Sequence, residues 1–207
     1  MKAPSDSTKE TRRPVRKLKI IGGITATLVI GWLLFVTLNV LYPSQGDLES
    51  PSDAVVSLSP QHYRLPLAEE IWSNTGTNTL VISYVEPGLG PFERYTPPQL
   101  PDAVVEYCQM EPRDDVVCLP PEEISTIGEA FSVNDLAAEQ SWDSITVVTS
   151  KWHTFRTRFL FNQCIDGDVD VNIVYPESEM SAEQWGWYVA YENAAFIKAL
   201  YEGTFRC

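Results

Sequence analysis

This sequence has few histidines, no paired-cysteine metal motif and none of the common glycine-rich phosphate loops. Its two histidines, His62 and His153, lie far apart, and its four cysteines show no C-x-x-C spacing, which argues against a zinc site. The sequence also lacks a G-x-S-x-G elbow, a Walker loop and an intact G-x-G-x-x-G. The main sequence evidence for a serine hydrolase or a nucleotide hydrolase is therefore missing. We therefore expect no metal and no cofactor.

Basic residues are scarce after the first 42 positions. Seven of the 15 Lys and Arg residues precede residue 20, which leaves eight basic against 26 acidic residues in 43–207. Such an excess of negative charge repels both the phosphate backbone of nucleic acids and anionic lipid headgroups. This composition excludes nucleic acid as a partner and predicts that the acidic part stands away from the bilayer.

Formal charge is absent from 20–42, a run of 23 residues. At 1.5 Å per residue, a helix of that length crosses a hydrocarbon core of about 30 Å. The basic residues before it predict a cytoplasmic tail at 1–19, one span of the cell membrane at 20–42 and an extracytoplasmic location for the rest. No small-residue cleavage pattern follows, which favours an anchor over a signal peptide. We expect a linker at 43–52 and a domain at 53–207.

All four cysteines lie in the part predicted to be extracytoplasmic, where disulfides persist. The even number supports complete pairing, for which three connectivities are possible. The short spacing favours Cys108 with Cys118. Cys164 would then pair with Cys207 and fix the C-terminal end of the chain.

Short β-branched runs alternate with helical patterns throughout the domain. Strands are expected at 54–58, 79–83, 115–119, 144–149 and 169–174. Helices are expected at 62–73, 102–109, 127–139, 152–163 and 181–202. This alternation predicts an α/β fold with a mostly parallel sheet, covered on both faces, whose ligands bind outside the carboxyl ends of the strands. The proline-rich segment 84–101 is expected to form a long loop.

Polar side chains mark the predicted helix start after the fourth strand. Thr149 or Ser150 can cap this helix, and His153 and Arg156, three residues apart, share one of its faces. Because a helix N-terminus carries partial positive charge, an arginine there requires a carboxylate or a bound phosphate nearby. We therefore expect the functional site at this strand end.

The helix start after the third strand carries a second polar group. Thr126 and Glu129 have the spacing of a helix capping box. In a binding site, Thr126 would instead face a ligand, and the lack of a side chain at Gly128 would let that ligand approach the backbone closely. If the two helix starts are neighbours, Glu129 reaches Arg156 or His153. That contact would be either a structural salt bridge or an acid/base pair in which Glu129 orients His153. Spacing alone leaves these alternatives open.

The order strand, Ser-Thr-x-Gly-Glu-Ala, strand, Val-Thr-Ser-x-x-His-x-x-Arg resembles the SanA, ElyC and YdcF-like family of bacterial envelope proteins. The match spans about 53–202 and includes Arg64 and Glu192. The resemblance implies a Rossmann-like three-layer fold behind one membrane helix, and a role in envelope assembly. Family members usually have glycines in the turns after the first two strands, where this chain has Ser59 and Ser83.

These observations predict a membrane-anchored factor in cell-envelope or cell-wall biogenesis. Its ligand would be anionic and contain phosphate, as a peptidoglycan precursor or a lipid carrier does. Arg156 would hold the charge, and in an enzymatic version His153 would transfer protons with Glu129 orienting it. The other predicted ligand contacts are Ser59, Arg64, Ser83, Thr126, Gly128, Thr149 and Ser150.

Two other functions are compatible with the same residues. The first is a non-catalytic interaction module with a degenerated pocket, which would dock an envelope partner through its acidic surface or its aromatic C-terminal helix. That helix contains Trp185, Trp187, Tyr188 and Tyr191, whose spacing is more typical of core packing than of sugar or lipid binding. The second is a methyl-donor or nucleotide-binding domain, suggested by fold analogy alone.

Overall fold

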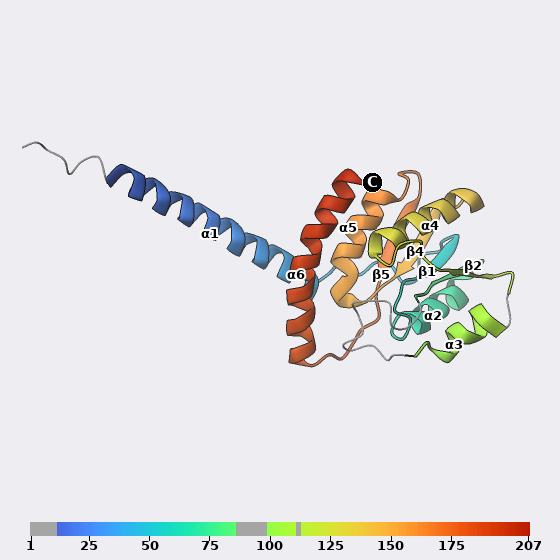
Figure 1. Cartoon of the computed structure of the whole chain (residues 1–207). Coiled ribbons are helices and arrows are strands. Elements are labelled where there is room, and N and C mark those ends of the chain that lie inside the picture. Colours follow the sequence, from blue (N-terminus) through green and yellow to red (C-terminus); the bar gives the residue numbers. More distant parts are fainter. Residues whose placement is uncertain (1–11, 86–98, 111–112) are drawn as a thin grey trace, which may run out of the picture.

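The structure, a computed structural model, describes residues 12–85, 99–110 and 113–207, with side chains from Lys19 onward (Figure 1). A long N-terminal helix, α1 (Arg12–Leu41), leads into an α/β domain whose first strand begins at Ala54. Most of the segment 84–101, expected to form a loop, lies outside the described residues.

A five-stranded parallel sheet forms the centre of the domain. The strands are β1 (Ala54–Ser57), β2 (Thr79–Ser83), β3 (Val116–Leu119), β4 (Ser144–Val148) and β5 (Asp170–Val174). They are hydrogen-bonded in the order β3-β2-β1-β4-β5, and every pairing is parallel. The prediction of a mostly parallel α/β sheet is therefore confirmed. Because the chain reverses its direction across the sheet between β1 and β4, the crevice at their carboxyl ends is where folds of this type bind ligands.

Helices follow each strand, as the alternating pattern predicted. They are α2 (Leu65–Thr75), α3 (Asp102–Val105) continued by η1 (Glu106–Met110), α4 (Thr126–Gln140), η2 (Lys151–His153) continued by α5 (Thr154–Cys164), and α6 (Ala182–Phe205). The first of these begins three residues later than expected, with a proline in its first turn, which proline favours. The helix after β4 opens with one 3-10 turn, so His153 lies at the junction of η2 and α5.

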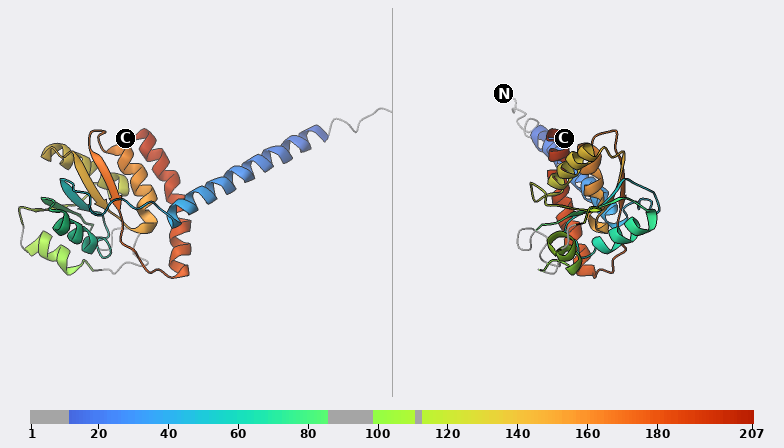
Figure 2. Two further views of the ribbon diagram at one scale, coloured as in Figure 1. Left: turned by 180° about the vertical axis from the view of Figure 1, so that it is seen from behind. Right: turned by 90° about the vertical axis from the view of Figure 1, so that its right-hand side faces the viewer.

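Two hydrophobic cores lie on opposite faces of the sheet. Val56 packs with α4, α5 and α6, whereas its neighbour Val55 packs with α2 and α3, since successive strand residues point to opposite faces. Figures 1 and 2 show α2 and α3 on one face, α4 and α5 on the other, and α6 outside α5. Residues of α6 therefore separate the sheet from the surface on that side.

The end of α1 packs against this domain. Its segment Lys19–Leu41 is long and apolar enough to cross a membrane. Within that segment Val36 and Val40 are buried against the domain core, and the Trp32 ring lies 5.9 Å from the Phe196 ring of α6. The last third of α1 is thus part of the packed structure.

The linker 43–52 lies along β5 and is not a free spacer. The Gly46 N–H donates to the Ile173 carbonyl at 3.0 Å. The Gln45 amide donates to the Tyr175 carbonyl at 2.9 Å and accepts from the Tyr175 N–H at 3.2 Å. These contacts attach the segment predicted to be a linker to the edge of the sheet.

Both expected disulfides are present. Cys108 of η1 pairs with Cys118 of β3, and Cys164 at the end of α5 pairs with Cys207, the last residue. The second bond holds the C-terminal end of α6 against α5. The prediction from sequence spacing is therefore confirmed for both pairs.

Candidate functional site

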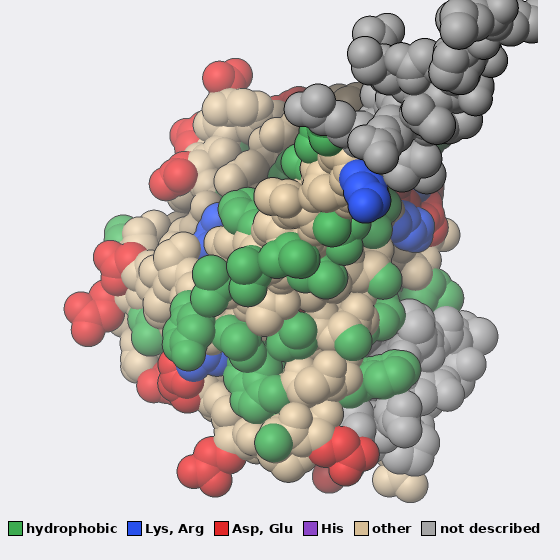
Figure 3. All heavy atoms as spheres, turned by 90° about the vertical axis from the view of Figure 1, so that its left-hand side faces the viewer, with side chains coloured by type: hydrophobic (Ala, Val, Ile, Leu, Met, Phe, Trp, Pro, Cys, Tyr) green, Lys and Arg blue, Asp and Glu red, His purple; other side chains and the backbone are tan. Residues whose placement is uncertain are grey.

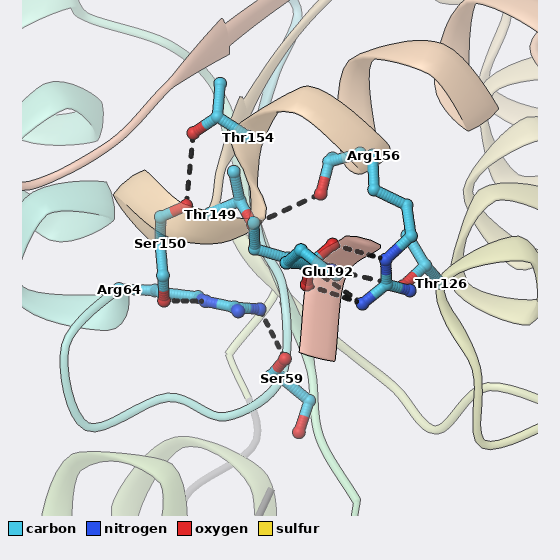
Figure 4. Close-up of polar contacts among 10 residues, drawn as sticks. Ser59, Arg64, Thr126, Thr149, Ser150, Thr154, Arg156 and Glu192 are labelled. Carbon is cyan, nitrogen blue, oxygen red and sulfur yellow. Dashed lines mark hydrogen bonds and ion pairs between the residues drawn. The ribbon is translucent and has the colours of Figure 1, made fainter. Parts of the chain in front are cut away.

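Polar side chains gather at the carboxyl ends of β1, β2 and β4, where the direction of the chain across the sheet reverses (Figure 4). We call this group the polar cluster. Its members are Ser59, Arg64, Ser83, Thr126, Glu129, Ser150, His153, Arg156 and Glu192. All of them are buried except Ser59, which is half-buried. Five ionisable side chains inside one small domain are unusual, because burying charge is costly unless it is compensated.

Arg156 and Glu192 form the centre of one half of the polar cluster. The Arg156 guanidinium donates from Nε to Glu192 Oε2 at 2.9 Å, from Nη2 to Glu192 Oε1 at 3.0 Å, and from Nη1 to Thr126 Oγ1 at 2.9 Å. Arg156, near the start of α5, thus forms an ion pair with a carboxylate, as expected for a cation at a helix N-terminus. That carboxylate comes from α6 and not from Glu129.

His153 completes this half of the polar cluster. Its Nδ1 lies 3.0 Å from Glu192 Oε1, and its Nε2 lies 3.1 Å from Thr126 Oγ1. Nδ1 also lies 2.9 Å from Arg156 Nη2. We assign the ring proton to Nδ1, which then donates to Glu192 Oε1, because Arg156 Nη2 already donates to the same carboxylate oxygen. Nε2 then accepts from the Thr126 hydroxyl. The expectation that Glu129 orients His153 is wrong, since Glu192 does so.

Burial and charge set the protonation states of this half. Burial lowers the pKa of His153 to about 4, aided by the charge of Arg156 and opposed by Glu192. Burial alone would raise the pKa of Glu192, but Arg156 and His153 outweigh it and hold that pKa at about 2. At neutral pH the group therefore consists of a neutral imidazole between an arginine and a carboxylate.

Glu129 belongs to the other half of the polar cluster. Its Oε1 accepts from the Ser59 N–H and from the Ser83 hydroxyl, both at 2.8 Å. Burial raises the pKa of Glu129, while the charge of Arg64 opposes that shift. The carboxylate thus ties α4 to the turns after β1 and β2. Ser59 and Ser83, expected to contact a ligand, hold Glu129 instead.

The start of α4 is capped by Ser125 and not by Thr126. The Ser125 hydroxyl accepts from the Gly128 N–H at 3.1 Å, which frees the Thr126 side chain to face Arg156 and His153. The Thr126–Glu129 capping box is therefore absent. Gly128 has a structural role, because a Cβ there would collide with the carbonyl oxygen of Glu123.

Within the polar cluster, Arg64 is the cation that has no carboxylate against it. It occupies the N-cap position of α2 and is 1% exposed. Its Nε donates to Ser150 Oγ at 3.0 Å, and its Nη1 donates to the Ser59 carbonyl. Among the described residues no carboxylate oxygen lies within 4.0 Å of it, and no hydrogen bond involves its Nη2. Burial accordingly lowers its pKa to about 10, with Glu129 only partly opposing the shift.

The two hydroxyls expected to cap the helix after β4 have other roles. Thr149 Oγ1 lies 3.3 Å from Thr157 Oγ1, and Ser150 Oγ accepts from Arg64. Neither side chain caps η2. Ser150 thus remains in the polar cluster, whereas Thr149 fastens β4 to α5 and is better regarded as structural.

A cavity of about 240 Å³ is lined by chain neighbours of the polar cluster, Tyr63 and Trp152 among them, but not by the members of the cluster themselves. Trp152 and Tyr188 help to line it, and their rings stack 4.3 Å apart. Trp152 precedes His153 in the chain, and Tyr188 lies one helical turn before Glu192 on the same face of α6. Tyr188 is buried, as expected for core packing, whereas Trp187 is 40% exposed.

Two residues of the site were not predicted as such. Glu192 was noted in the resemblance but given no role, although it is the lone acid between residues 184 and 201 in an apolar helix. Gln61 joins the turns after β1 and β2 through the Ser57 hydroxyl and the Ser83 carbonyl. Nothing in its sequence surroundings distinguishes Gln61 from an ordinary loop residue.

Comparison of the chain with protein-family models, curated proteins and solved structures gave no match. The functional argument therefore depends on the geometry of the polar cluster.

Proposed function

We propose that the chain is a single-pass membrane protein whose extracytoplasmic domain binds a phosphate-containing anion in the polar cluster. In this proposal α1 is the membrane span, the N-terminus is cytoplasmic, and the process is assembly of a bacterial cell envelope, as in the SanA, ElyC and YdcF-like family. The apolar length of Lys19–Leu41 supports the anchor. The basic residues before it support the orientation.

The observation that carries the anion proposal is the uncompensated charge of Arg64. A buried guanidinium normally has a carboxylate against it, because desolvation of a lone cation is costly. The pKa of about 10 corresponds to a penalty on the charged form of about 3 kcal/mol. A bound phosphate would offset that penalty by placing a negative charge directly against the guanidinium.

The position of Arg64 also favours an anion. Its guanidinium lies at the carboxyl ends of β1 and β4, beside the start of η2. There it donates to the Ser150 hydroxyl and to the Ser59 carbonyl (Figure 4). Nη2 donates to no described residue, which leaves its N–H groups for a ligand. Arg156, first expected to hold the charge, is instead fully engaged by Glu192 and Thr126. Arg64 therefore replaces Arg156 as the proposed anion-binding cation.

The geometry supports binding more directly than catalysis. Thr126, His153 and Glu192 form a hydroxyl–imidazole–carboxylate chain of the kind that activates nucleophiles. However, an imidazole with a pKa of about 4 is a weak base at neutral pH. Arg156 also donates to the same Thr126 hydroxyl. We therefore propose that His153 maintains the network and does not transfer protons.

One observation favours the alternative of an interaction module. Arg156, His153, Glu192 and Thr126 satisfy one another, as they would in a pocket that had lost its ligand. A module would need no ligand at Arg64. Its docking surface would then be the acidic exterior, and anions would leave the stability of the chain unchanged.

Binding of pyrophosphate to the full-length chain in detergent micelles separates these functions. Isothermal titration at constant ionic strength should show saturable binding to the wild type, weakened at least about tenfold, or 1.4 kcal/mol, in Arg64→Gln. Arg113→Gln, which removes an exposed arginine paired with Asp115, should bind like the wild type. Inorganic phosphate and a short-chain isoprenyl phosphate, titrated in parallel, identify whether the headgroup or the lipid provides affinity. Equal binding by a folded Arg64→Gln protein would contradict the proposed site.

A further inference from the structure

The exposed face of α6 carries a continuous apolar stripe. Six residues at helical spacing form this α6 stripe: Gly186, Ala190, Ala194, Ile197, Tyr201 and Phe205. The three large side chains, Ile197, Tyr201 and Phe205, are 60%, 64% and 73% exposed. Soluble domains rarely leave a row of large apolar side chains this exposed without a partner.

Acidic residues avoid this face. After Glu183, the two remaining acids of α6, Glu192 and Glu202, are both buried, so its exposed charge is the cation Lys198. The part of the chain after residue 42 contains 26 acidic residues, so an acid-free exposed helix face is notable. Viewed from the side on which α1 leaves the domain and points toward the viewer, hydrophobic side chains of α1 and of the domain lie in the centre, and acidic ones lie around the margin (Figure 3).

The position of α1 places this face near the bilayer. From Lys19 to Trp32 the helix rises about 20 Å, which is less than the hydrocarbon thickness of about 30 Å. Trp32 contacts Phe196 of α6, and buried Val36 and Val40 continue the same contact surface. If Lys19 marks the cytoplasmic boundary, the contact with α6 lies within the outer leaflet. Tilting of α1 would bring that contact closer to the bilayer centre.

We propose that the α6 stripe lies in the outer leaflet of the bilayer that α1 spans, at the boundary between headgroups and acyl chains. The domain would then rest on the membrane, with α6 crossing the end of α1 as Figures 1 and 2 show. This inference rests on α1 being a membrane span, but not on anion binding. Tyr201 and Phe205 suit that boundary. The Lys198 ammonium, which lies 3.3 Å from Glu202 Oε1, is on a largely exposed side chain that can also reach the headgroups.

Lipid fits this surface better than a second copy of the chain. The exposed α1 residues Leu34 and Leu38, 59% and 55% exposed, lie on the segment that packs against α6. In a bilayer these side chains and the α6 stripe would contact one continuous apolar medium. A second copy would have to cover α6 while leaving room for the lipid around α1.

Photo-crosslinking to lipid tests this inference. A benzophenone analogue of phenylalanine is placed singly at Tyr201, at Leu28 of α1 or at exposed Met110 of η1 in the full-length chain, reconstituted in phosphatidylcholine vesicles. We expect lipid adducts from position 201 within about threefold of those from position 28, and at least about tenfold above those from position 110. Ile197→Asp should lower the yield at position 201 several-fold because an anion opposes interfacial insertion.

The outcomes separate the membrane span from the surface contact. Lipid adducts at position 28 without adducts at position 201 would overturn the outer-leaflet contact and leave the anchor intact. Crosslinked dimers at position 201 in place of lipid adducts would overturn it in favour of self-association. Absence of lipid adducts at both positions would refute the anchor and the surface contact together.

Discussion

Glu192 holds Arg156 through two hydrogen bonds, Nε to Oε2 at 2.9 Å and Nη2 to Oε1 at 3.0 Å, inside the protein. The same carboxylate lies 3.0 Å from His153 Nδ1. Because Glu192 belongs to α6 while Arg156 and His153 belong to the segment after β4, this relationship ties the outermost helix to the carboxyl edge of the sheet. It also gives α6 two roles, one on its buried face and one proposed for its exposed face.

Loss of the Glu192 charge should destabilise the protein strongly. Glu192→Gln leaves Arg156 buried without its counter-ion, and breaking such a pair costs about 3–5 kcal/mol. Urea unfolding of the full-length chain in micelles, followed by tryptophan fluorescence, measures this loss. Glu177→Gln breaks the exposed pair with Lys151 and should cost less than about 1 kcal/mol. Similar losses in the two variants would show that the buried pair is not a structural centre.

Acidification should destabilise the protein in two steps. The pKa of His153 is about 4, below its ordinary value of 6.5, so the folded state binds fewer protons and stability falls as pH drops from 6.5 to 4. The pKa of Glu192 is about 2, so its contribution is present above pH 4.5 and is lost between 4.5 and 2. From pH 7 to 5 the His153 contribution is about 2 kcal/mol.

Histidine variants test that assignment. His153→Gln should flatten the stability profile between pH 6.5 and 4, measured by urea unfolding at half-unit pH steps. Burial also lowers the pKa of His62, but this side chain is partly exposed. His62→Gln should therefore retain most of the slope. A profile that flattens only in His62→Gln would contradict a buried neutral His153.

Substitutions at the start of α4 should distinguish capping from the polar cluster. Thr126→Val removes the acceptor of Arg156 Nη1 and the donor to His153 Nε2, which should cost about 1–3 kcal/mol. Ser125→Ala removes the helix cap and should cost about 1 kcal/mol. Only Thr126→Val should shift the His153 imidazole resonances in NMR spectra. Thr126→Ser keeps the hydroxyl and should restore them.

The two disulfides should differ in their stabilising effect. Chain-entropy arguments give about 4 kcal/mol for Cys164–Cys207, with a sequence separation of 43, and about 3 kcal/mol for Cys108–Cys118, with a separation of 10. Replacing each pair by alanines and measuring urea midpoints tests the ranking. Peptide mapping of the non-reduced protein checks the pairing itself. Mixed pairs in the native protein would contradict the structure.

Much of the fold could be predicted because its signals are local. The β-branched runs gave all five strands to within about two residues, which is the usual uncertainty of element ends. Cysteine spacing gave both pairs. The attachment of 43–52 to the sheet could not be predicted, because composition indicates only the flexibility of an isolated segment. Gly46 bonds to β5 and Gln45 to Tyr175 just after it, more than 100 residues away.

The side chains that the sequence predicts at one edge of the sheet do meet there, but their partners were assigned wrongly. Parallel strands bring their carboxyl ends together, so Thr126, His153, Arg156 and Arg64 could be expected at one edge. Spacing paired Glu129 with His153 because their helix starts seemed to be neighbours. In the structure Glu129 accepts hydrogen bonds from Ser59 and Ser83. His153 instead pairs with Glu192 of α6, which packs on the outside of α5.

The sequence by itself determined the apolar helix, the alternating α/β pattern, the Cys108–Cys118 pair and the need for a negative charge near Arg156, since each depends on residues close together in the chain. The Cys164–Cys207 pair then followed by elimination among four cysteines. Tertiary structure alone decided which carboxylate pairs with which cation. It left Arg64 without a carboxylate partner among the described residues and brought α1 against α6. The physical reason is that ion pairing and helix packing depend on distances between atoms in the folded chain. Spacing along the sequence does not predict those distances.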